Sequence, residues 1–398
     1  MPSSSGSPRV LFVTHNAPRY VGDAAGSFVL RLAVALHQAG AGVDILAPGA
    51  AALASQDVIE GISIKRVRYA PDAQMNLAYE GQMAEIVKTS LRAKINLAKL
   101  LFSMRRATSR ALKEAQREGR PYHVVHAHWW FPSALAVHRL RERQRQSIPL
   151  VITMHGSDVR LAEHSKPAHV MMRSVLEEAA LCTTVSSWLR GMAAAIVPDA
   201  SIVVSPMPVD MRTFTASREQ RSGILFAGRL NRQKGLSDLL KAMTMPELQS
   251  ATLDIVGDGI ERASLMALAA QYGIENRLRW HGALPQSQLA LMYQRARVVA
   301  IPSRGEGLGL VAVEAQLAGT PVVAYEDGGL PDVVRVEHGG SLVKPGDTVT
   351  LANAVASLIN NPDLAEQKGS SAAAAMRDLF TPEAAAERYL DHYRTVQQ

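Results

Sequence analysis

The same order of elements is expected in both halves of this chain of 398 residues. Each half contains a short apolar run, then a stretch with apolar residues at helical spacing, then a second short run. These segments are 10–13, 27–39 and 43–46 in the first half, and 224–227, 236–243 and 253–256 in the second. Short strands that alternate with helices are typical of parallel sheets with helices packed on their faces. The sequence therefore predicts an α/β protein with two parallel-sheet domains.

Further apolar runs and one segment with two prolines place the remaining strands and the domain boundary. Strands are also expected at 124–127, 151–154, 182–185, 298–301, 322–324 and 340–343. The chain is too long for one ordinary core, which favours two large domains. Pro206 and Pro208 lie close together, and a segment with two prolines cannot be the interior of a helix. We place the boundary there, between domains 1–205 and 206–380.

Composition is that of a globular protein, with 47% hydrophobic and 20% charged residues. The sequence has no run of about eighteen apolar residues that could span a bilayer. Its first nine residues lack the hydrophobic stretch of a signal peptide. A single cysteine, Cys182, excludes an intramolecular disulfide and agrees with a reducing compartment. We therefore expect a cytoplasmic protein.

Positive charge is concentrated in the first half. Residues 1–200 contain 24 Lys and Arg against 15 Asp and Glu, whereas residues 201–398 contain 19 against 21. Most of the excess lies in 91–120, whose cations are Arg92, Lys94, Lys99, Arg105, Arg106, Arg110, Lys113, Arg117 and Arg120. Apolar residues stand among them, namely Leu91, Ile95, Leu97, Leu101, Phe102 and Met104, so the segment predicts a basic amphipathic helix. It is either a solvated helix packed on its own sheet, or a helix that docks on an anionic membrane surface or an anionic acceptor.

A glycine-rich turn that leads into an apolar helix lies at 302–314. Its glycines are Gly305, Gly307 and Gly309, and its carboxylates are Glu306 and Glu314. The glycines let the backbone approach a ligand closely, and a helix that starts near Leu310 offers N–H groups to an anion. The carboxylates would repel a phosphate unless they bind something else, such as hydroxyl groups. A ligand with phosphates in its middle and polyols at both ends fits this pattern, which points to a nucleotide-sugar.

A second candidate phosphate site lies at 226–235, between an expected strand and an expected helix. Arg229 and Lys234 fall in the connecting loop. In open parallel sheets ligands bind beyond the carboxyl ends of the strands, where this loop lies. Two cations there could hold a diphosphate and stabilise the charge that develops on it as it leaves. Solvated loop charges are the alternative, and the glycine-rich turn in the same half favours binding.

Two loops of the first half also carry candidate contacts. His155 and Asp158 follow the strand 151–154, where a histidine could hydrogen-bond a sugar hydroxyl, although a lone histidine is more often structural. Asp158 could equally be the N-cap of the following helix. The loop 15–27 after the first strand contains Gly26 just before a helix, which makes Gly26 another candidate anion contact.

Histidines and aromatic residues are concentrated at 126–131. His126 and His128 share a face of the expected strand, but no nearby Cys, Asp or Glu completes a metal-ligand set, so we reject a metal site. Trp129, Trp130 and Phe131 could stack on sugar faces, while core packing is the expected role of at least one of them. The chain also contains no Asp-x-Asp pair to hold a metal at the diphosphate. We therefore expect neither a metal nor a separate cofactor.

These motifs together resemble the retaining GT-B glycosyltransferases of family 4. The resemblance rests on Pro-Ser-x-x-Glu-Gly-x-Gly-Leu-Val with Glu306 and Glu314, followed by Ala-Gly-Thr-Pro-Val-Val-Ala at 318–324. It continues through further segments of the second half, at 228–235, 256–259, 328–334 and 339–347. The first half is similar more loosely, through 126–129 and 155–158. It implies two Rossmann-like domains that face each other across a cleft, with a last helix at 381–398 that crosses back to the first domain.

The resemblance also implies roles for single residues. Arg229 and Lys234 would bind the donor diphosphate, Glu306 the hydroxyls of the transferred sugar, and Glu314 the ribose. His155 would line the catalytic cleft from the other domain. The donor cradle would be completed by Gly26, Gly228, Gly307, Leu308, Gly309, Leu310 and Val311. The candidate contacts on the acceptor side are His128, Trp129, Trp130 and Asp158.

The expected function is transfer of a hexose-type sugar, with retention, from a nucleotide-diphosphate donor to a hydroxyl acceptor. The acceptor is a carbohydrate, a lipid-linked compound or a small molecule, and no nucleic-acid partner is expected. A same-fold epimerase or phosphorylase and a non-catalytic nucleotide-sugar-binding protein are the alternatives. If the helix at 91–120 docks on lipid, the protein would be peripheral at the inner membrane face.

Overall fold

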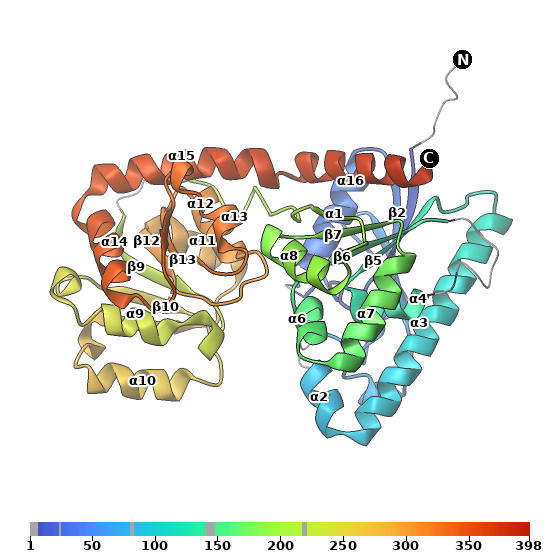
Figure 1. Ribbon diagram of the computed structural model, residues 1–398, viewed down its shortest axis with the longest axis horizontal. Helices are drawn as coiled ribbons and strands as arrows, with labels where there is room; N and C mark the ends of the chain where they lie inside the picture. Colours follow the sequence, from blue (N-terminus) through green and yellow to red (C-terminus); the bar gives the residue numbers. More distant parts are fainter. Residues whose placement is uncertain (1–6, 24, 80–82, 139, 141–147, 217–220) are drawn as a thin grey trace, which may run out of the picture. The chain divides into compact units, whose positions relative to one another are not determined.

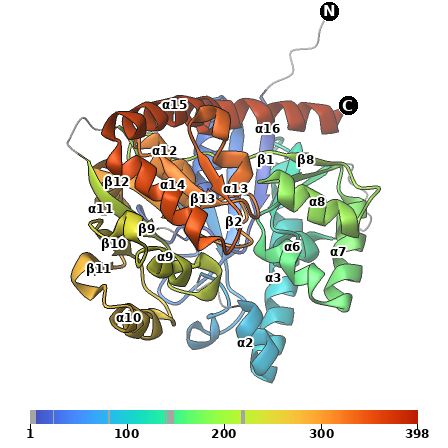
Figure 2. The same ribbon diagram turned by 60° about the vertical axis from the view of Figure 1, so that its left-hand side comes forward.

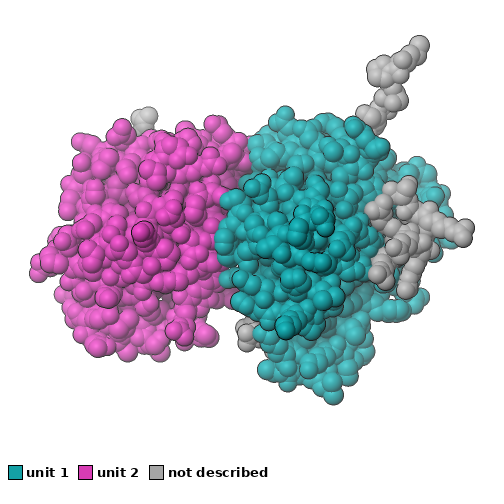
Figure 3. Space-filling model, in the orientation of Figure 1, with its two compact units in different colours: residues 1–208, 382–398 teal, residues 209–381 magenta. Residues whose placement is uncertain are grey.

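A computed structural model describes residues 7–23, 25–79, 83–138, 140, 148–216 and 221–398. The chain forms two compact units, coloured separately in Figure 3. Unit 1 contains Met1–Pro208 and Pro382–Gln398, and unit 2 contains Val209–Thr381. The boundaries expected from the sequence, after residues 205 and 380, lie slightly before these divisions.

One sheet forms the centre of unit 1, with the strand order β3-β4-β2-β1-β5-β6-β7-β8 among the described residues (Figure 1). Its strands are β1 (Arg9–Val13), β2 (Gly42–Pro48), β3 (Gln56–Ile59), β4 (Ile62–Val67), β5 (Val124–His128), β6 (Leu150–Met154), β7 (Leu181–Thr184) and β8 (Ile202–Val204). Strand β3 pairs antiparallel with β4, and the other neighbouring strands pair in parallel. The five strands predicted in this half are confirmed, whereas β3, β4 and β8 were not predicted.

Helices cover both faces of this sheet. They are α1 (Ser27–Gln38), α2 (Met83–Thr89), α3 (Leu91–Arg117), α4 (Leu135–Val137), α6 (Ser157–Glu163), α7 (Lys166–Glu178), α8 (Ser187–Ile196) and α16 (Pro382–Gln397). Although α16 follows unit 2 in the sequence, it packs along α1 in unit 1 (Figures 1 and 2). Two buried tyrosines fasten it to the sheet, because Tyr393 pairs with His126 of β5 at 2.7 Å and Tyr389 donates to the carbonyl of Ser205 at 3.2 Å.

Unit 2 has a second sheet, in the order β11-β10-β9-β12-β13-β14 among its described strands. The strands are β9 (Ser222–Ala227), β10 (Leu253–Val256), β11 (Leu278–Gly282), β12 (Ala296–Ile301), β13 (Val322–Tyr325) and β14 (Ser341–Val343), and all neighbours pair in parallel. Every strand predicted here is confirmed, and β11 was not predicted. The predicted α/β class with two parallel-sheet domains is therefore confirmed.

The helices of unit 2 are α9 (Leu236–Ala242), α10 (Arg262–Gln271), α11 (Gln286–Arg295), α12 (Leu310–Leu317), α13 (Leu330–Val333), α14 (Thr348–Asn360) and α15 (Pro362–Phe380). Alternate residues of each strand point to opposite faces. Accordingly Ile224 and Phe226 of β9 belong to one buried cluster with the apolar side chains of α9, α10 and α14. Helices α12 and α15 pack against each other. Because the loops at the carboxyl ends of β9 and β12 start from this rigid core, they hold their side chains in fixed positions.

The basic helix predicted at 91–120 is α3, but its packed face differs from the expectation. The buried side of α3 is formed mainly by Ala93, Asn96, Leu100, Met104, Thr108, Ala111, Leu112 and Ala115. Of the apolar residues that defined the expected face, Met104 is buried, whereas Leu91, Ile95 and Phe102 are 75%, 50% and 65% exposed. The buried side thus combines small residues with Leu100, Met104 and Leu112. Three large apolar side chains of α3 therefore lie on its exposed side.

Candidate active site

The glycine-rich turn of unit 2 lies between β12 and α12, as predicted. Helix α12 begins at Leu310, and Gly309 precedes it as the N-cap. Leu310 and Val311 are the first two residues of the helix, so their N–H groups have no acceptor within it. Gly309 has a φ of 92°, which favours glycine, and a Cβ there would lie 2.7 Å from a methyl carbon of Leu330, which would have to shift. The turn therefore presents backbone N–H groups and the positive end of a helix dipole.

Two neighbouring loops hold this turn in place. On one side, Gln233 donates from its side chain to the carbonyl of Gly305 at 3.1 Å and accepts from the N–H of Arg304 at 2.8 Å. On the other side, the N–H of Gly329 donates to the carbonyl of Glu306 at 2.8 Å. Gly328 packs so closely that a Cβ there would lie 2.5 Å from the nitrogen of Glu306. The backbone of Glu306 is thus fixed before any ligand arrives.

Lys234 and Glu306 form an ion pair, although 72 residues separate them in the sequence. Their side chains are 20% and 13% exposed, so the pair is largely shielded from water but reachable. The loop from β9 carries Lys234 to this position, where Asn231 caps the short turn by accepting from the N–H of Lys234 at 3.2 Å. Arg229 lies exposed on the same loop, and no described residue forms an ion pair with it. One cation is balanced by Glu306, and the other is available to an anion.

Glu314 of α12 is 9% exposed and is held by a tyrosine of the neighbouring helix. The hydroxyl of Tyr293 in α11 donates to Oε2 of Glu314 at 3.2 Å. Burial, together with the adjacent Glu314 carboxylate, raises the pKa of Tyr293 well above its ordinary value, so this hydroxyl keeps its proton. Tyr293 was not predicted, because nothing in the sequence links residues on two separate helices.

The predicted residues of unit 1 lie at the carboxyl ends of β5 and β6. Asp158, in the first turn of α6, accepts from three backbone N–H groups, those of His155 at 3.2 Å, Gly156 at 3.0 Å and Trp130 at 3.1 Å. It is 3% exposed, and burial raises its pKa while these three bonds act in the opposite direction. The N-cap of α6 is Gly156. Asp158 is therefore not the N-cap that the sequence suggested, and its carboxylate fastens two loops together. A contact between Asp158 and the acceptor stays a prediction.

Two other residues expected on the acceptor side are also buried. His128 and Trp130 are 0% exposed, and the indole N–H of Trp130 donates to the carbonyl of Asp158 at 2.7 Å. Both side chains are thus used in packing, and a contact of either with the acceptor stays a prediction. Trp129 is 7% exposed and packs its ring against three others, those of His15 at 4.4 Å, His155 at 4.3 Å and Phe28 at 5.6 Å between ring centres. Its main role is to pack in this cluster, although its backbone adopts the left-handed φ of 67° that often marks functional sites.

His155 directly follows β6 and is partly exposed at the edge of this cluster. Burial of the ring, together with the neighbouring His128 and His15, lowers the pKa of His155 well below its ordinary value. Burial likewise lowers the pKa of His15 to about 4. Both rings are therefore neutral near pH 7, and His155 can offer a neutral imidazole to a ligand.

The loop after β1 carries Gly26, the N-cap of α1. A Cβ on Gly26 would lie 2.4 Å from the carbonyl oxygen of Asn16, so packing within the loop already requires glycine there. A contact between Gly26 and a donor phosphate stays a prediction.

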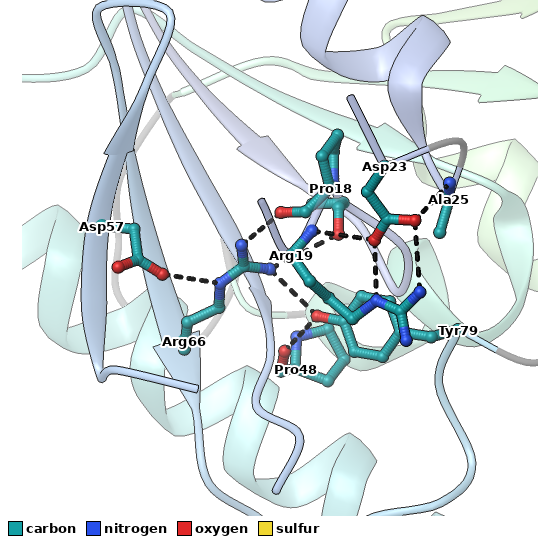
Figure 4. Close-up of polar contacts among 9 residues, drawn as sticks. Pro18, Arg19, Asp23, Ala25, Pro48, Asp57, Arg66 and Tyr79 are labelled. Carbon is teal, nitrogen blue, oxygen red and sulfur yellow. Dashed lines mark hydrogen bonds and ion pairs between the residues drawn. The ribbon is translucent and has the colours of Figure 1, made fainter. Parts of the chain in front are cut away.

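A buried arginine holds the same loop, as Figure 4 shows. The guanidinium of Arg66 on β4 donates to the carbonyl of Pro18 and to the hydroxyl of Tyr79, the latter at 3.0 Å. Arg19 and Asp23 close the loop through an ion pair of 2.7 Å. None of these residues was predicted, because β4 reads as a polar segment and its arginine as a surface charge. These contacts hold the described residues 18–23 of the loop beside β4.

No group of three or more His, Cys, Asp or Glu side chains in the described part of the chain could hold a metal ion. Among the same residues, no helix has both the length and the apolar character needed to cross a membrane.

Comparison with known proteins agrees with this geometry. The family described as "Glycosyl transferases group 1" matches residues 210–374, and "Glycosyltransferase Family 4" matches residues 25–213. A D-inositol 3-phosphate glycosyltransferase from Kribbella flavida is 30% identical over 94% of this chain and 92% of its own length. The chain belongs to glycosyltransferase family 4. A glycogen synthase from Mycobacterium tuberculosis is 28% identical to this family 4 enzyme, over 92% of the chain and 89% of the relative.

Solved structures show the same fold. A sucrose-phosphate synthase from Thermosynechococcus elongatus superposes with a TM-score of 0.78 at 23% identity, covering 98% of this chain and 99% of that one. The Anabaena protein HepE, solved with UDP and glucose, gives a TM-score of 0.68 at 19% identity over 98% and 100% of the two chains. The predicted GT-B fold and the family resemblance are confirmed. The chain is therefore a glycosyltransferase.

One more cluster of this family 4 enzyme supports the glycine-rich turn. The Arg304 side chain forms an ion pair of 2.8 Å with Asp238 of α9, and the hydroxyl of Tyr325 donates to the same carboxylate oxygen at 2.8 Å. Burial and the Asp238 carboxylate raise the pKa of Tyr325. The cluster ties the start of the turn to α9, which follows directly after Lys234 and Gly235. It thereby helps to set the separation between Lys234 and Glu306.

Proposed function

We propose that this glycosyltransferase moves a hexose-type sugar, with retention of the anomeric configuration, from a nucleotide-diphosphate donor to a hydroxyl acceptor. The observation that carries the proposal is the pairing of Lys234 with Glu306. It brings a cation for phosphate and a carboxylate for hydroxyl groups to one point, beside the start of α12. The presence of UDP and glucose in the HepE structure supports the same kind of donor.

Each part of this site has a role in the proposal. The cations of Arg229 and Lys234 bind the diphosphate, together with the N–H groups that run from Gly307 to Val311. Glu306 accepts hydrogen bonds from hydroxyls of the transferred sugar. Glu314, which keeps acceptor capacity beside Tyr293, binds the ribose hydroxyls. In this way the carboxylates bind hydroxyl groups, and the cations and backbone amides bind phosphate.

Transfer in this proposal needs no nucleophile from the protein. The acceptor oxygen attacks the anomeric carbon from the face that the diphosphate leaves, and the electron pair of the breaking C–O bond passes to the phosphate oxygen. The proton of the acceptor hydroxyl moves to the same departing oxygen. Arg229 and Lys234 stabilise the charge that develops there, which is the largest electrostatic demand of the step.

The alternatives differ from this proposal in what they consume. An epimerase or a phosphorylase would convert a nucleotide-sugar without a foreign acceptor, and a binding protein would consume none. The decisive assay follows nucleotide release from a panel of UDP-, GDP- and ADP-sugars, with and without acceptor extracts. Acceptor-dependent release, with a product whose anomeric linkage matches the donor by NMR, is expected. If no donor is consumed and none raises the melting temperature, the transferase proposal fails.

We also propose that the exposed side of α3 docks on an anionic membrane surface, with the enzyme at the inner membrane face. Leu91, Ile95 and Phe102 are spaced four and seven residues apart, so they lie on one side of the helix. Three exposed large apolar residues in this arrangement would enter the boundary between headgroups and acyl chains. A carbohydrate or lipid-linked acceptor at the membrane would then be within the enzyme's reach.

Positive charge flanks this apolar stripe. A groove of about 500 Å³ in unit 1, between α3 and β4, is lined by Lys65, Arg68, Arg106 and Arg110 among others. Lys65 and Arg68 are paired with Glu114 and Asp72, whereas no described residue pairs with Arg106 or Arg110. Each Lys or Arg close to an anionic surface contributes about 1 kcal/mol of attraction. The charges thus favour anionic over neutral lipid.

Sedimentation with vesicles tests this docking. The wild-type protein should bind vesicles that contain phosphatidylglycerol and not vesicles of phosphatidylcholine alone. Replacing Leu91, Ile95 and Phe102 with serine should weaken binding by more than about tenfold, because each inserted side chain contributes about 1.5–3 kcal/mol. Ile260→Ser, at a residue of unit 2 that is 96% exposed, is the matched control. Equal binding of the triple variant and the wild type would contradict the proposal and leave α3 as a solvated helix.

A further inference from the structure

Two histidines from adjacent strands of unit 1 share one hydrogen bond. Nδ1 of His128, at the end of β5, lies 3.2 Å from Nε2 of His155, which directly follows β6. His128 is fully buried, and its other nitrogen, Nε2, has no hydrogen-bond partner among the described residues. No described residue bonds to Nδ1 of His155 either. Unlike Nε2 of His128, this nitrogen is not a buried atom without a partner. The pair is thus joined at one end and has one free nitrogen on each ring.

Both rings are neutral at ordinary pH. Burial lowers the pKa of His128 and of His155 well below the usual value, and the nearby histidine rings act in the same direction. A neutral imidazole carries one N–H and one bare nitrogen. The shared hydrogen bond needs one N–H and one bare nitrogen, so the position of a single proton determines the tautomer of both rings.

Two arrangements satisfy this condition. In the first, Nδ1–H of His128 donates to Nε2 of His155, so Nε2 of His128 is bare and His155 carries its proton on Nδ1. In the second, Nε2–H of His155 donates to Nδ1 of His128. The proton of His128 then sits on its buried Nε2, where no described residue accepts it. Proteins leave buried N–H groups without an acceptor more rarely than they leave acceptors underused, which favours the first arrangement.

The surroundings of His128 favour the same choice. Its neighbours are the rings of Phe12, at 4.8 Å, and His126, at 4.3 Å between ring centres. Both nitrogens of His126 are already engaged, with Tyr393 and with Thr153 at 2.7 Å each. His126 therefore cannot accept a proton from Nε2 of His128, and a bare nitrogen is the better occupant of that apolar site.

We infer that His128 is a positioning residue that places the ring proton of His155 on Nδ1. His155 then presents an N–H donor to its ligand and no bare nitrogen on that side. The next step rests on the proposed function. There, His155 donates a hydrogen bond to a sugar oxygen and does not take the acceptor's proton through Nδ1. The proton passes to the departing phosphate instead, so the buried pair decides which of two proton routes is open.

Nitrogen-15 NMR of the full-length chain, labelled in its histidine rings, reads these tautomers directly and without any substrate. His155 is assigned by the signals that disappear in His155→Gln. The wild-type spectrum should show His155 protonated on Nδ1 and bare on Nε2 at pH 7.5. A His155 ring protonated on Nε2, or on both nitrogens, would overturn the inference whatever the enzyme's activity.

Two substitutions of His128 test the cause. His128→Asn keeps an N–H donor near the position of Nδ1, so His155 should retain its proton on Nδ1. His128→Leu removes the donor, and His155 should shift to a mixture that includes the Nε2–H form. The ring signals of His126, whose two nitrogens are bonded to Tyr393 and Thr153, report whether either variant stays folded. An unchanged His155 tautomer in a folded His128→Leu protein would show that His128 does not set it.

Kinetics separate this inference from the proposed function. With a donor that the wild type consumes, His128→Leu should lower kcat/KM by about tenfold and His128→Asn by much less, because one hydrogen bond to a reacting ligand is misplaced. His164→Leu, at a histidine whose side chain is 77% exposed, is the matched control and should match the wild type. An enzyme inactive with every donor would remove the proposed function but leave the NMR result standing.

Discussion

Replacement of Gly235 by alanine should displace the loop that carries Lys234. Gly235 has a φ of 67°, and an added Cβ would lie 2.0 Å from the carbonyl oxygen of Pro302. Pro302 follows β12 and leads into the glycine-rich turn, so the clash lies between the two segments that hold Lys234 and Glu306. Cβ contacts below 3.0 Å are essentially never seen, so one segment must move by roughly an ångström.

Gly273 provides a matched control within the same unit. Its φ is 65°, and an added Cβ would meet nothing within 4 Å. Gly273→Ala therefore measures the backbone cost alone, which is about 1–2 kcal/mol for an L-residue in the left-handed region. Gly235→Ala should cost about 1–3 kcal/mol more, because overpacking of a tight site adds that amount. In a unit of this size, 1 kcal/mol corresponds to about 2–4 °C in Tm.

Calorimetry and donor binding together decide the outcome. The melting transition of Gly235→Ala should fall below that of Gly273→Ala by about 2–12 °C. Only Gly235→Ala should also lose binding of a donor that the wild type consumes, because its shift separates Lys234 from Glu306. If the two variants melt together and bind the donor equally, the close packing of Gly235 on Pro302 does not support the site.

Three shorter predictions concern single side chains. Lys234→Ala should lower kcat for nucleotide release by about 10²–10³, because it removes a charge that stabilises the departing diphosphate, and a rate near that of the wild type would contradict this role. Tyr293→Phe should destabilise unit 2 by about 1–2 kcal/mol in urea unfolding and raise the KM for the nucleotide-sugar. The reason is that Glu314, which is 9% exposed, loses the hydrogen bond that Tyr293 donates. Unchanged stability and KM would show that Tyr293 does not hold Glu314. Burial lowers the pKa of His15 to about 4, so the unfolded state binds more protons below pH 6.5. The free energy of unfolding should therefore fall by up to about 3 kcal/mol as the pH drops from 6.5 to 4. In urea titrations, His15→Gln should reduce that loss. An equal loss in the variant would exclude His15 as a cause.

The central strands of both sheets could be predicted from the sequence, as could β14 at one edge, whereas the edge strands β3, β8 and β11 and the neighbouring β4 could not. Strands β5 and β6 are buried at every position, so they appear as continuous apolar runs. Edge strands are covered on fewer sides and alternate with polar residues. In β11, exposed Arg279 and His281 interrupt the apolar pattern, and β3 begins with exposed Gln56. Local apolarity measures burial, so it fails where a strand is exposed.

The same limit explains which site residues were placed correctly. The turn around Glu306 is local, since its glycines and the start of α12 are adjacent in the sequence. Trp130 and Asp158 are 28 residues apart, and they bond to each other across the ends of β5 and β6. Their residue types suit a sugar site equally well, and only the fold shows that their polar atoms are already used. For α3, likewise, apolar residues at helical spacing stand on both sides, and only the fold shows that the side with Leu100, Met104 and Leu112 is buried.

In the proposed function, the pairing of Lys234 with Glu306 explains how opposite charges can serve one ligand. Without a ligand, each side chain neutralises the other at a place where either charge alone would be poorly solvated. A diphosphate that enters beside Arg229 competes for Lys234, and the hydroxyls of the attached sugar compete for Glu306. A ligand that brings only phosphate leaves the carboxylate without its partner, and one that brings only hydroxyls leaves the cation without an anion. The pair therefore selects for ligands that carry both groups on adjacent atoms, which a sugar bound to a diphosphate does.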